Sequence, residues 1–225
     1  MTEQGVTSCM KNIKGVIFDL DGTLLDSMWI WGDVAIEYLK RQGKNPQPGL
    51  REALRPLNTT EEAQYYIDEY GVDLPVDEVI AGRDNMMLEF LLTEVELKKG
   101  VKPVLEALKE RSIKMCIATA TERRLVEPSL HRHDIAKYFE RIYTCTEENT
   151  SKKNPDIYIR AAKFLGTEIK NTLVVEDALY AMETATKAGF AVAGVYDLVA
   201  DDQQEEIKAL CDYYWIHMDE MLKLL

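Results

Sequence analysis

Short apolar runs separated by helical patterns constrain the fold of this chain more than any other feature. Six runs have the length of strands, and several are apolar at nearly every position: 15–20, 113–118, 141–145, 172–175, 191–195 and 213–216. Strands without polar alternation are typical of parallel sheets, because helices cover both faces. Helical patterns at 101–111, 155–165 and 178–188 alternate with them. The sequence therefore predicts an α/β fold with a doubly wound, Rossmann-like parallel sheet.

Helical spacing also predicts which side chains of two of these helices face the sheet. In the first helix the inward set is Val101, Val104, Leu105 and Leu108. In the second it is Ile159, Ala162 and either Phe164 or Leu165.

The interval from about Ser27 to Leu97 breaks the alternation, because it contains no clear strand and shows helical spacing throughout. We interpret it as a helical insertion after the first strand. The predicted domains are an α/β core formed by residues 1–26 and 98–225, and a helical domain formed by residues 27–97. Ser27 and Thr60 are expected to be helix N-caps within the insertion.

Composition excludes several classes of function. The chain carries 27 Lys and Arg against 39 Asp and Glu, a net charge of −12, which argues against binding to nucleic acid or to anionic membranes. No apolar run is long enough to span a bilayer, and the N-terminus lacks an apolar signal core. By elimination we expect a cytoplasmic protein with four scattered, reduced cysteines: Cys9, Cys116, Cys145 and Cys211.

Two acidic residues, Asp19 and Asp21, lie at the carboxyl end of the first apolar run and flank one leucine. Ligands of open α/β sheets bind at this edge, and side chains two apart on a strand point the same way. Gly22 allows a sharp turn directly after them. The pair followed by Gly22-Thr23 therefore indicates a carboxylate site rather than an ordinary loop.

The segment Asp19-Leu20-Asp21-Gly22-Thr23 resembles the first motif of the haloacid dehalogenase-like hydrolase superfamily. Three further motifs follow in order: Thr119 at the end of a strand, Lys152 before Pro155-Asp156-Ile157-Tyr158, and Glu176-Asp177. The resemblance covers the whole chain. It is nearest to the β-phosphoglucomutase-like and phosphoglycolate phosphatase-like enzymes, whose helical cap lies where the helical insertion is predicted.

The chain departs from the family pattern at a few positions. Lys153 follows Lys152 where the family has proline, and counting back from Pro155 favours Lys152 as the functional lysine. Ala178 and Ala181 replace a common serine and a common glycine of the fourth motif. Neither of those two positions supplies a charge or a metal ligand, so the substitutions are expected to leave the catalytic activity in place.

The resemblance implies a Mg²⁺-dependent phosphatase acting on a small phosphorylated metabolite. Asp19 would attack phosphorus and form an aspartyl-phosphate, and Asp21 would act as general acid and base. Thr119, nearby backbone amides such as that of Ala120, and Lys152 would hold the phosphoryl oxygens. The Mg²⁺ ligands would be Asp19, the backbone carbonyl of Asp21, and Asp177, with Glu176 as a further ligand or beside the metal.

Other activities of this superfamily remain as alternatives. A dehalogenase would lack the second acid, Asp21. A sugar-phosphate mutase would carry a Gly-x-x-x-Arg loop where residues 54–60 stand, and a histidine shortly after Met28-Trp29-Ile30-Trp31. A phosphonatase would need a cap lysine, but Lys40 and Lys44 resemble exposed helix-end residues. A non-catalytic binding protein is disfavoured because the whole set of site residues is intact.

Specificity is expected to lie in the helical insertion. Trp29 or Trp31 would face the substrate or pack in the insertion's own core, and three arginines are candidates for a second anionic group: Arg51, Arg55 and Arg83. His131 and His133 are predicted to be surface residues. The sequence does not identify the substrate, and it is compatible with a monomer or a weak dimer.

Overall fold

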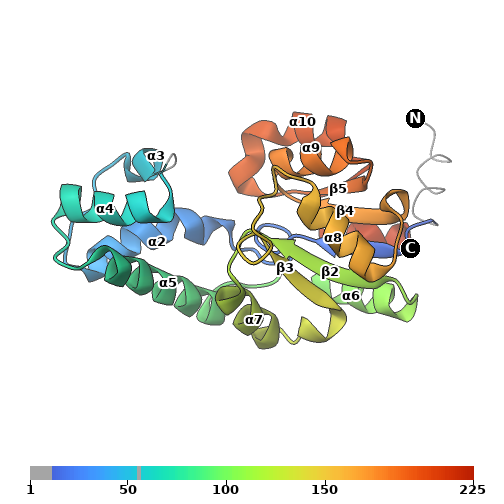
Figure 1. Ribbon diagram of the computed structural model, residues 1–225, viewed down its shortest axis with the longest axis horizontal. Coiled ribbons are helices and arrows are strands. Elements are labelled where there is room, and N and C mark those ends of the chain that lie inside the picture. The colour runs from blue at the N-terminus through green and yellow to red at the C-terminus, as the bar shows by residue number, and fades with distance from the viewer. Residues whose placement is uncertain (1–11, 55–56) are drawn as a thin grey trace. The chain divides into compact units, whose positions relative to one another are not determined.

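The computed structural model describes residues 12–54 and 57–225 (Figure 1). Cys9 and Arg55 lie outside the described residues. The chain divides into two compact units, one formed by the segment up to Asp26 together with Glu96–Leu225, and the other by Ser27–Val95.

A six-stranded, all-parallel sheet forms the centre of the first unit, in the order β3-β2-β1-β4-β5-β6. Its strands are β1 (Gly15–Phe18), β2 (Lys114–Thr119), β3 (Arg141–Thr144), β4 (Thr172–Glu176), β5 (Ala191–Val195) and β6 (Tyr213–Trp215). The predicted α/β fold class is confirmed. The first strand is shorter than predicted: it stops at Phe18 because the carbonyl of Leu20 accepts hydrogen bonds from the amides of residues 23–25, which form a turn.

Helices cover both faces of this sheet (Figure 1). The α-helices of the first unit are α6 (Val101–Glu110), α7 (Arg123–Arg132), α8 (Asp156–Leu165), α9 (Leu179–Lys187) and α10 (Gln204–Leu210). Short 3-10 helices are η1 (Ala136–Tyr138), η2 (Ile169–Asn171), η3 (Leu198–Gln203) and η4 (Met218–Lys223). On one face, residues of α8, α9 and α10 pack against Ile17, Cys116 and Val174 of three strands in a single apolar cluster. Every side chain of β1 is buried, as expected for a strand covered on both faces.

The inward faces of the helices were predicted correctly for α6 but only partly for α8. The four inward residues of α6 are all buried. In α8, Ile159 is 38% exposed, which contradicts the prediction; Ala162 and Leu165 are buried as predicted, and Phe164, the alternative to Leu165, is 47% exposed. The buried stripe is Ile157, Tyr158, Ala161, Ala162 and Leu165. This set follows i, i+4 spacing from Ile157, and the ring of Phe164 lies edge-on to Tyr143 at the rim of the sheet (centroids 6.3 Å apart).

In the described residues of the second unit, all regular secondary structure is helical. Its helices are α2 (Met28–Arg41), α3 (Leu50–Leu54), α4 (Thr59–Tyr70) and α5 (Val76–Thr93). α5 packs against both α2 and α4, and Tyr38 and Tyr66 are buried among them. Within the described part of the chain, every helix is too short or too polar to cross a lipid bilayer.

One of the two predicted N-caps in this unit is wrong. Ser27 precedes α2 as expected, although its side chain makes no capping hydrogen bond. The cap of α4 is Asn58 rather than Thr60. The side-chain oxygen of Asn58 accepts hydrogen bonds from the amides of Thr60 and Glu61, and the carboxylate of Glu61 accepts one from the amide of Asn58. This reciprocal capping box explains why the helix begins two residues earlier than predicted.

Candidate active site

The polar residues singled out in the sequence meet at the carboxyl edge of the sheet. β1 lies between β2 and β4, with Phe18 in register with Ile117 and Val175. Asp19 directly follows β1, Thr119 ends β2, and Glu176 ends β4. Because parallel strands end at the same edge, residues far apart in the chain become neighbours there, as the strand-end pattern predicted.

Three carboxylates form a buried group that we call the carboxylate cluster: Asp19, Glu176 and Asp177. One oxygen from each lies within 4.8 Å of the others. Their exposed fractions are 6%, 0% and 5%, so water solvates these oxygens poorly. Like charges this close in a dry site repel strongly, and the arrangement requires positive charge beside it.

Lys152 supplies part of that positive charge. Its ammonium donates hydrogen bonds to Asp19 and to Oε1 of Glu176, the latter at 2.7 Å. Lys152 is buried, whereas the neighbouring Lys153 is exposed. Lys152 is therefore the lysine that points into the cluster. The hydroxyl of Tyr158 donates to the same Glu176 oxygen at 2.8 Å, a contact that the sequence did not predict.

The pKa values of the cluster reflect this crowding. Burial raises the pKa of Asp19, Lys152 opposes that shift, and the charges of Glu176 and Asp177 add to it, so the net direction is upward. Burial and then Glu176 raise the pKa of Asp177 from 3.8 to about 7. Burial lowers the pKa of Lys152, but Asp19 and Glu176 outweigh it and keep the ammonium charged. One ammonium faces three acids, so the fully ionised cluster has two negative charges in excess.

A divalent cation fits this group. Oε2 of Glu176 is buried and has no hydrogen-bond partner, although a carboxylate oxygen in such surroundings normally has one. All three residues offer carboxylate oxygens, the hard ligands that Mg²⁺ prefers. The excess of negative charge matches the charge of the ion. The residues present therefore suit the predicted metal in number, in chemistry and in charge.

Asp21 does not belong to the carboxylate cluster; its side chain turns toward β2 instead. Its Oδ2 accepts a hydrogen bond from the hydroxyl of Thr121 at 2.6 Å, and the amide of Thr121 donates to Oγ1 of Thr119 at 3.0 Å. Thr119 and Thr121 are buried, while Ala120 between them is exposed. The sequence analysis missed Thr121, although its place two residues after Thr119 was a signal that could have identified it.

The turn after Asp21 matches the predicted role of Gly22. Gly22 has φ 80°, in the left-handed region that favours glycine, and its amide donates to the carbonyl of Leu25. The hydroxyl of Thr23 lies 3.5 Å from Oδ1 of Asp177. The first motif therefore folds back over the end of β4 and contacts the carboxylate cluster.

Several residues named as candidates in the helical insertion are engaged within that unit. Trp29 and Trp31 are 39% and 38% exposed, and Trp29 lies edge-on to Phe90. Arg51 pairs with Asp33, and the poorly exposed Arg83 pairs with Glu62 at 2.6 Å. Lys44 donates to the carbonyl of Gly71 at 2.5 Å.

The prediction that both histidines of the 131–133 segment lie at the surface is half wrong. His131 is exposed, but His133 is buried. His133 is the C-cap of α7, and its Nε2 lies 3.1 Å from a guanidinium nitrogen of Arg132. The chain folds back on the helix end at this point, since the amide of Ile135 donates to the carbonyl of Leu130.

Residues 16–195 match the family model described as haloacid dehalogenase-like hydrolase, and they include every strand-end residue described above. The chain belongs to this family. The match spans both units and confirms the predicted resemblance.

The chain is also similar to individual proteins and solved structures. The chain is 28% identical to (DL)-glycerol-3-phosphatase 1, mitochondrial, of Arabidopsis thaliana, over 83% of this chain and 65% of that protein. It is also 28% identical to the bifunctional riboflavin kinase/FMN phosphatase of the same plant, over 81% of this chain. The chain spans about half the length of that protein (48%). A solved structure of a family IA, variant 3 hydrolase from Entamoeba histolytica superposes with a TM-score of 0.76 at 23% identity, covering 94% of this chain and 99% of the other.

Proposed function

We propose that this chain is a Mg²⁺-dependent phosphatase that hydrolyses a small phosphate monoester through an aspartyl-phosphate on Asp19. The observation that carries the proposal is the placement of Asp19 beside the Lys152 ammonium and next to the carboxylates of Glu176 and Asp177. A nucleophilic carboxylate beside a cation and a metal-ligand set is what phosphoryl transfer to an aspartate requires. Support also comes from two relatives, which are named for phosphatase activity on glycerol 3-phosphate and on FMN.

In the first half of the reaction, an Asp19 oxygen attacks phosphorus in line with the ester oxygen. The new bond to Asp19 forms as the bond to the leaving alkoxide breaks, and the Asp21 carboxyl gives its proton to that alkoxide. Lys152 and the Thr119 hydroxyl, with the Ala120 amide, offset the charge on the phosphoryl oxygens. When bound by Asp19, Asp177, the carbonyl of Asp21 and Glu176, Mg²⁺ supplies further charge neutralisation.

In the second half, Asp21 has become a carboxylate and takes a proton from water. That water attacks the phosphorus of the aspartyl-phosphate, which releases inorganic phosphate and regenerates Asp19. The hydrogen bond from Thr121 to Asp21 supports this assignment, because it orients a carboxyl group that is separate from the metal ligands. Asp21 therefore remains available for proton transfer.

We also propose that the unit Ser27–Val95 acts as the cap that selects the substrate. A sugar-phosphate mutase remains the second candidate for function, since it would use the same core residues. The cytoplasmic location and the monomeric or weakly dimeric state stay predictions.

A phosphate-release assay tests the proposal. The full chain is incubated with MgCl₂ and a panel of phosphate monoesters that includes glycerol 3-phosphate and FMN. We expect release of inorganic phosphate that EDTA abolishes and that Asp19→Asn reduces by about a thousandfold or more. No release by folded protein across the panel, or retained activity in Asp19→Asn, would overturn it. Formation of glucose 6-phosphate from β-glucose 1-phosphate and a bisphosphate primer, without free phosphate, would establish the mutase instead.

A further inference from the structure

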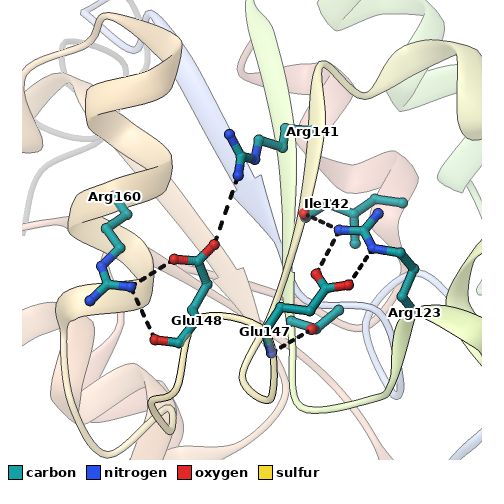
Figure 2. A network of polar contacts seen from close by, with 7 residues as sticks. Arg123, Arg141, Ile142, Glu147, Glu148 and Arg160 are labelled. Atoms are coloured by element: carbon teal, nitrogen blue, oxygen red, sulfur yellow. Dashed lines mark hydrogen bonds and ion pairs between the residues drawn. The ribbon is translucent and has the colours of Figure 1, made fainter.

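The segment that carries Lys152, residues 145–155, connects β3 to α8, and we call it the lysine loop. Its backbone bonds mainly to itself: the amide of Thr150 donates to the carbonyl of Cys145, and the amide of Asn154 to that of Ser151. Two adjacent glutamates near its start, Glu147 and Glu148, turn to opposite sides (Figure 2). Each of them meets an arginine from a different helix.

Glu147 is held by Arg123, the first residue of α7. Nε and Nη2 of Arg123 lie 2.6 Å and 2.7 Å from the two oxygens of Glu147, a two-pronged contact that fixes orientation as well as distance (Figure 2). Nη2 of Arg123 also donates to the carbonyl of Ile142 on β3 at 3.0 Å. This hydrogen bonding lowers the pKa of the Glu147 carboxyl, so the pair stays charged at neutral pH.

Glu148 is held on the opposite side by Arg160 of α8. Nη1 of Arg160 donates to Oε2 of Glu148 at 2.7 Å and to its backbone carbonyl at 3.0 Å. Arg141 approaches the other oxygen of Glu148 at 3.9 Å. The first part of the lysine loop is thus held by side chains of two helices.

The position of Arg123 in the chain means that its ion pair with Glu147 connects two segments that carry active-site residues. Arg123 lies two residues after Thr121, in the segment that carries Thr119, and Glu147 lies five residues before Lys152. Besides the backbone hydrogen bond from the amide of Cys145 to the carbonyl of Thr119, this ion pair therefore links the segment with the phosphate-binding threonine to the loop with the lysine. Both partners are more than a third exposed, and exposed pairs contribute little to global stability. We therefore expect the pair to act on the position of the lysine loop rather than on the free energy of unfolding.

We propose that Arg123 and Glu147 are positioning residues, which set the lysine loop against the Thr119–Thr121 segment so that Lys152 reaches the transferred phosphoryl group. This inference rests on the proposed function. Displacements of about 1 Å in a site built for charge stabilisation cost up to about a hundredfold in rate. Because Lys152 acts on charge that develops during transfer, loss of the pair should lower kcat more than it raises KM.

The kinetic test uses Glu147→Gln, Arg123→Gln and the double variant. We expect each single variant to lower kcat by about tenfold with KM changed less than about twofold, and the double variant to lose no more than either single one. Glu127→Gln is the matched control, because Glu127 pairs with the same arginine at 3.0 Å but belongs to α7 itself, so that ion pair does not link the helix to the loop. Its kcat should equal that of the wild type. Equal losses in Glu127→Gln and Glu147→Gln, or unchanged kcat in Glu147→Gln, would overturn the inference.

A second measurement does not depend on activity. Reductive methylation of the metal-free protein, followed by mass spectrometry, reports how fast Lys152 reacts, with Lys153 as an internal reference. We expect Glu147→Gln to speed the labelling of Lys152 by about tenfold, with Lys153 unchanged, and Glu127→Gln to change neither. If the wild type proves inactive on every phosphate ester, the proposed function fails and this labelling decides the inference alone. Lys152 labelled at the wild-type rate in Glu147→Gln would overturn it.

Discussion

The Nζ atom of Lys152 lies 2.7 Å from Oε1 of Glu176, and both side chains are almost completely buried. The same ammonium bonds to Asp19, so a single lysine connects the proposed nucleophile to the end of β4. Burial of charges is costly, and removing one partner of a buried pair leaves the others uncompensated. Lys152 therefore contributes to the stability of the metal-free protein as well as to the proposed chemistry.

Lys152→Met should lower the free energy of unfolding of the metal-free protein by about 3 kcal/mol at neutral pH, because the carboxylate cluster loses its buried cation. Urea denaturation followed by circular dichroism measures this change. Lys153→Met is the matched control, since Lys153 is the next residue but is exposed, and its effect should stay within about 0.5 kcal/mol. Equal effects of the two substitutions would contradict this account.

The sequence was sufficient to predict the strands and the residues at their ends. Apolar runs as continuous as residues 172–175 suit only strands covered on both faces, and parallel order then brings Asp19 and Glu176 to one edge. Contacts made across the fold could not be predicted in this way. Thr121 and Asp21 are separated by 100 residues, and only the packing of β2 beside β1 brings them together.

The other differences between prediction and structure arise where a local sequence pattern fits more than one arrangement. In α8, Ile159 lies three residues before Ala162, so it satisfies helical spacing as well as the stripe that begins at Ile157 does, and the sheet decides between the two faces. His133 lies in a polar segment, so its burial depends on the chain that folds back over the end of α7.

The N-terminus of α4 offers a test of one of these differences. The segment Asn58-Thr59-Thr60 contains three residues that can cap a helix, and only Asn58 makes the capping hydrogen bonds. Asn58→Ala should therefore lower the free energy of unfolding by about 1 kcal/mol, whereas Thr60→Ala should have little effect. Chemical denaturation of the two variants beside the wild type measures the difference. A larger loss in Thr60→Ala would restore the original prediction.

Thr121→Val should lower kcat by about tenfold, because Asp21 loses the hydroxyl that orients its carboxyl for proton transfer. Steady-state phosphate release over a range of pH measures both the loss and any shift of the profile. Thr121→Ser keeps the hydroxyl and should retain most of the wild-type rate. Full activity in Thr121→Val, with the protein folded, would show that this hydrogen bond does not serve the reaction.

The raised pKa of Asp177 predicts how Mg²⁺ and pH act together on stability. In the unfolded chain this carboxyl loses its proton near 3.8, whereas burial keeps it protonated up to about pH 7 in the folded, metal-free protein. The folded state therefore binds more protons across this window, and the free energy of unfolding falls as the pH rises through it. In the proposed site Mg²⁺ would bind the deprotonated carboxylates, so its stabilising effect should grow over the same window. We expect saturating MgCl₂ to raise Tm by about 5 °C at pH 8 and by less than about 1 °C at pH 5, as measured by differential scanning fluorimetry. Asp177→Asn should weaken the pH dependence and remove most of the Mg²⁺ effect, since its amide neither titrates nor carries the charge that the ion requires. An equal or larger Mg²⁺ shift at pH 5 in the wild type would contradict the assignment of Asp177 to the metal.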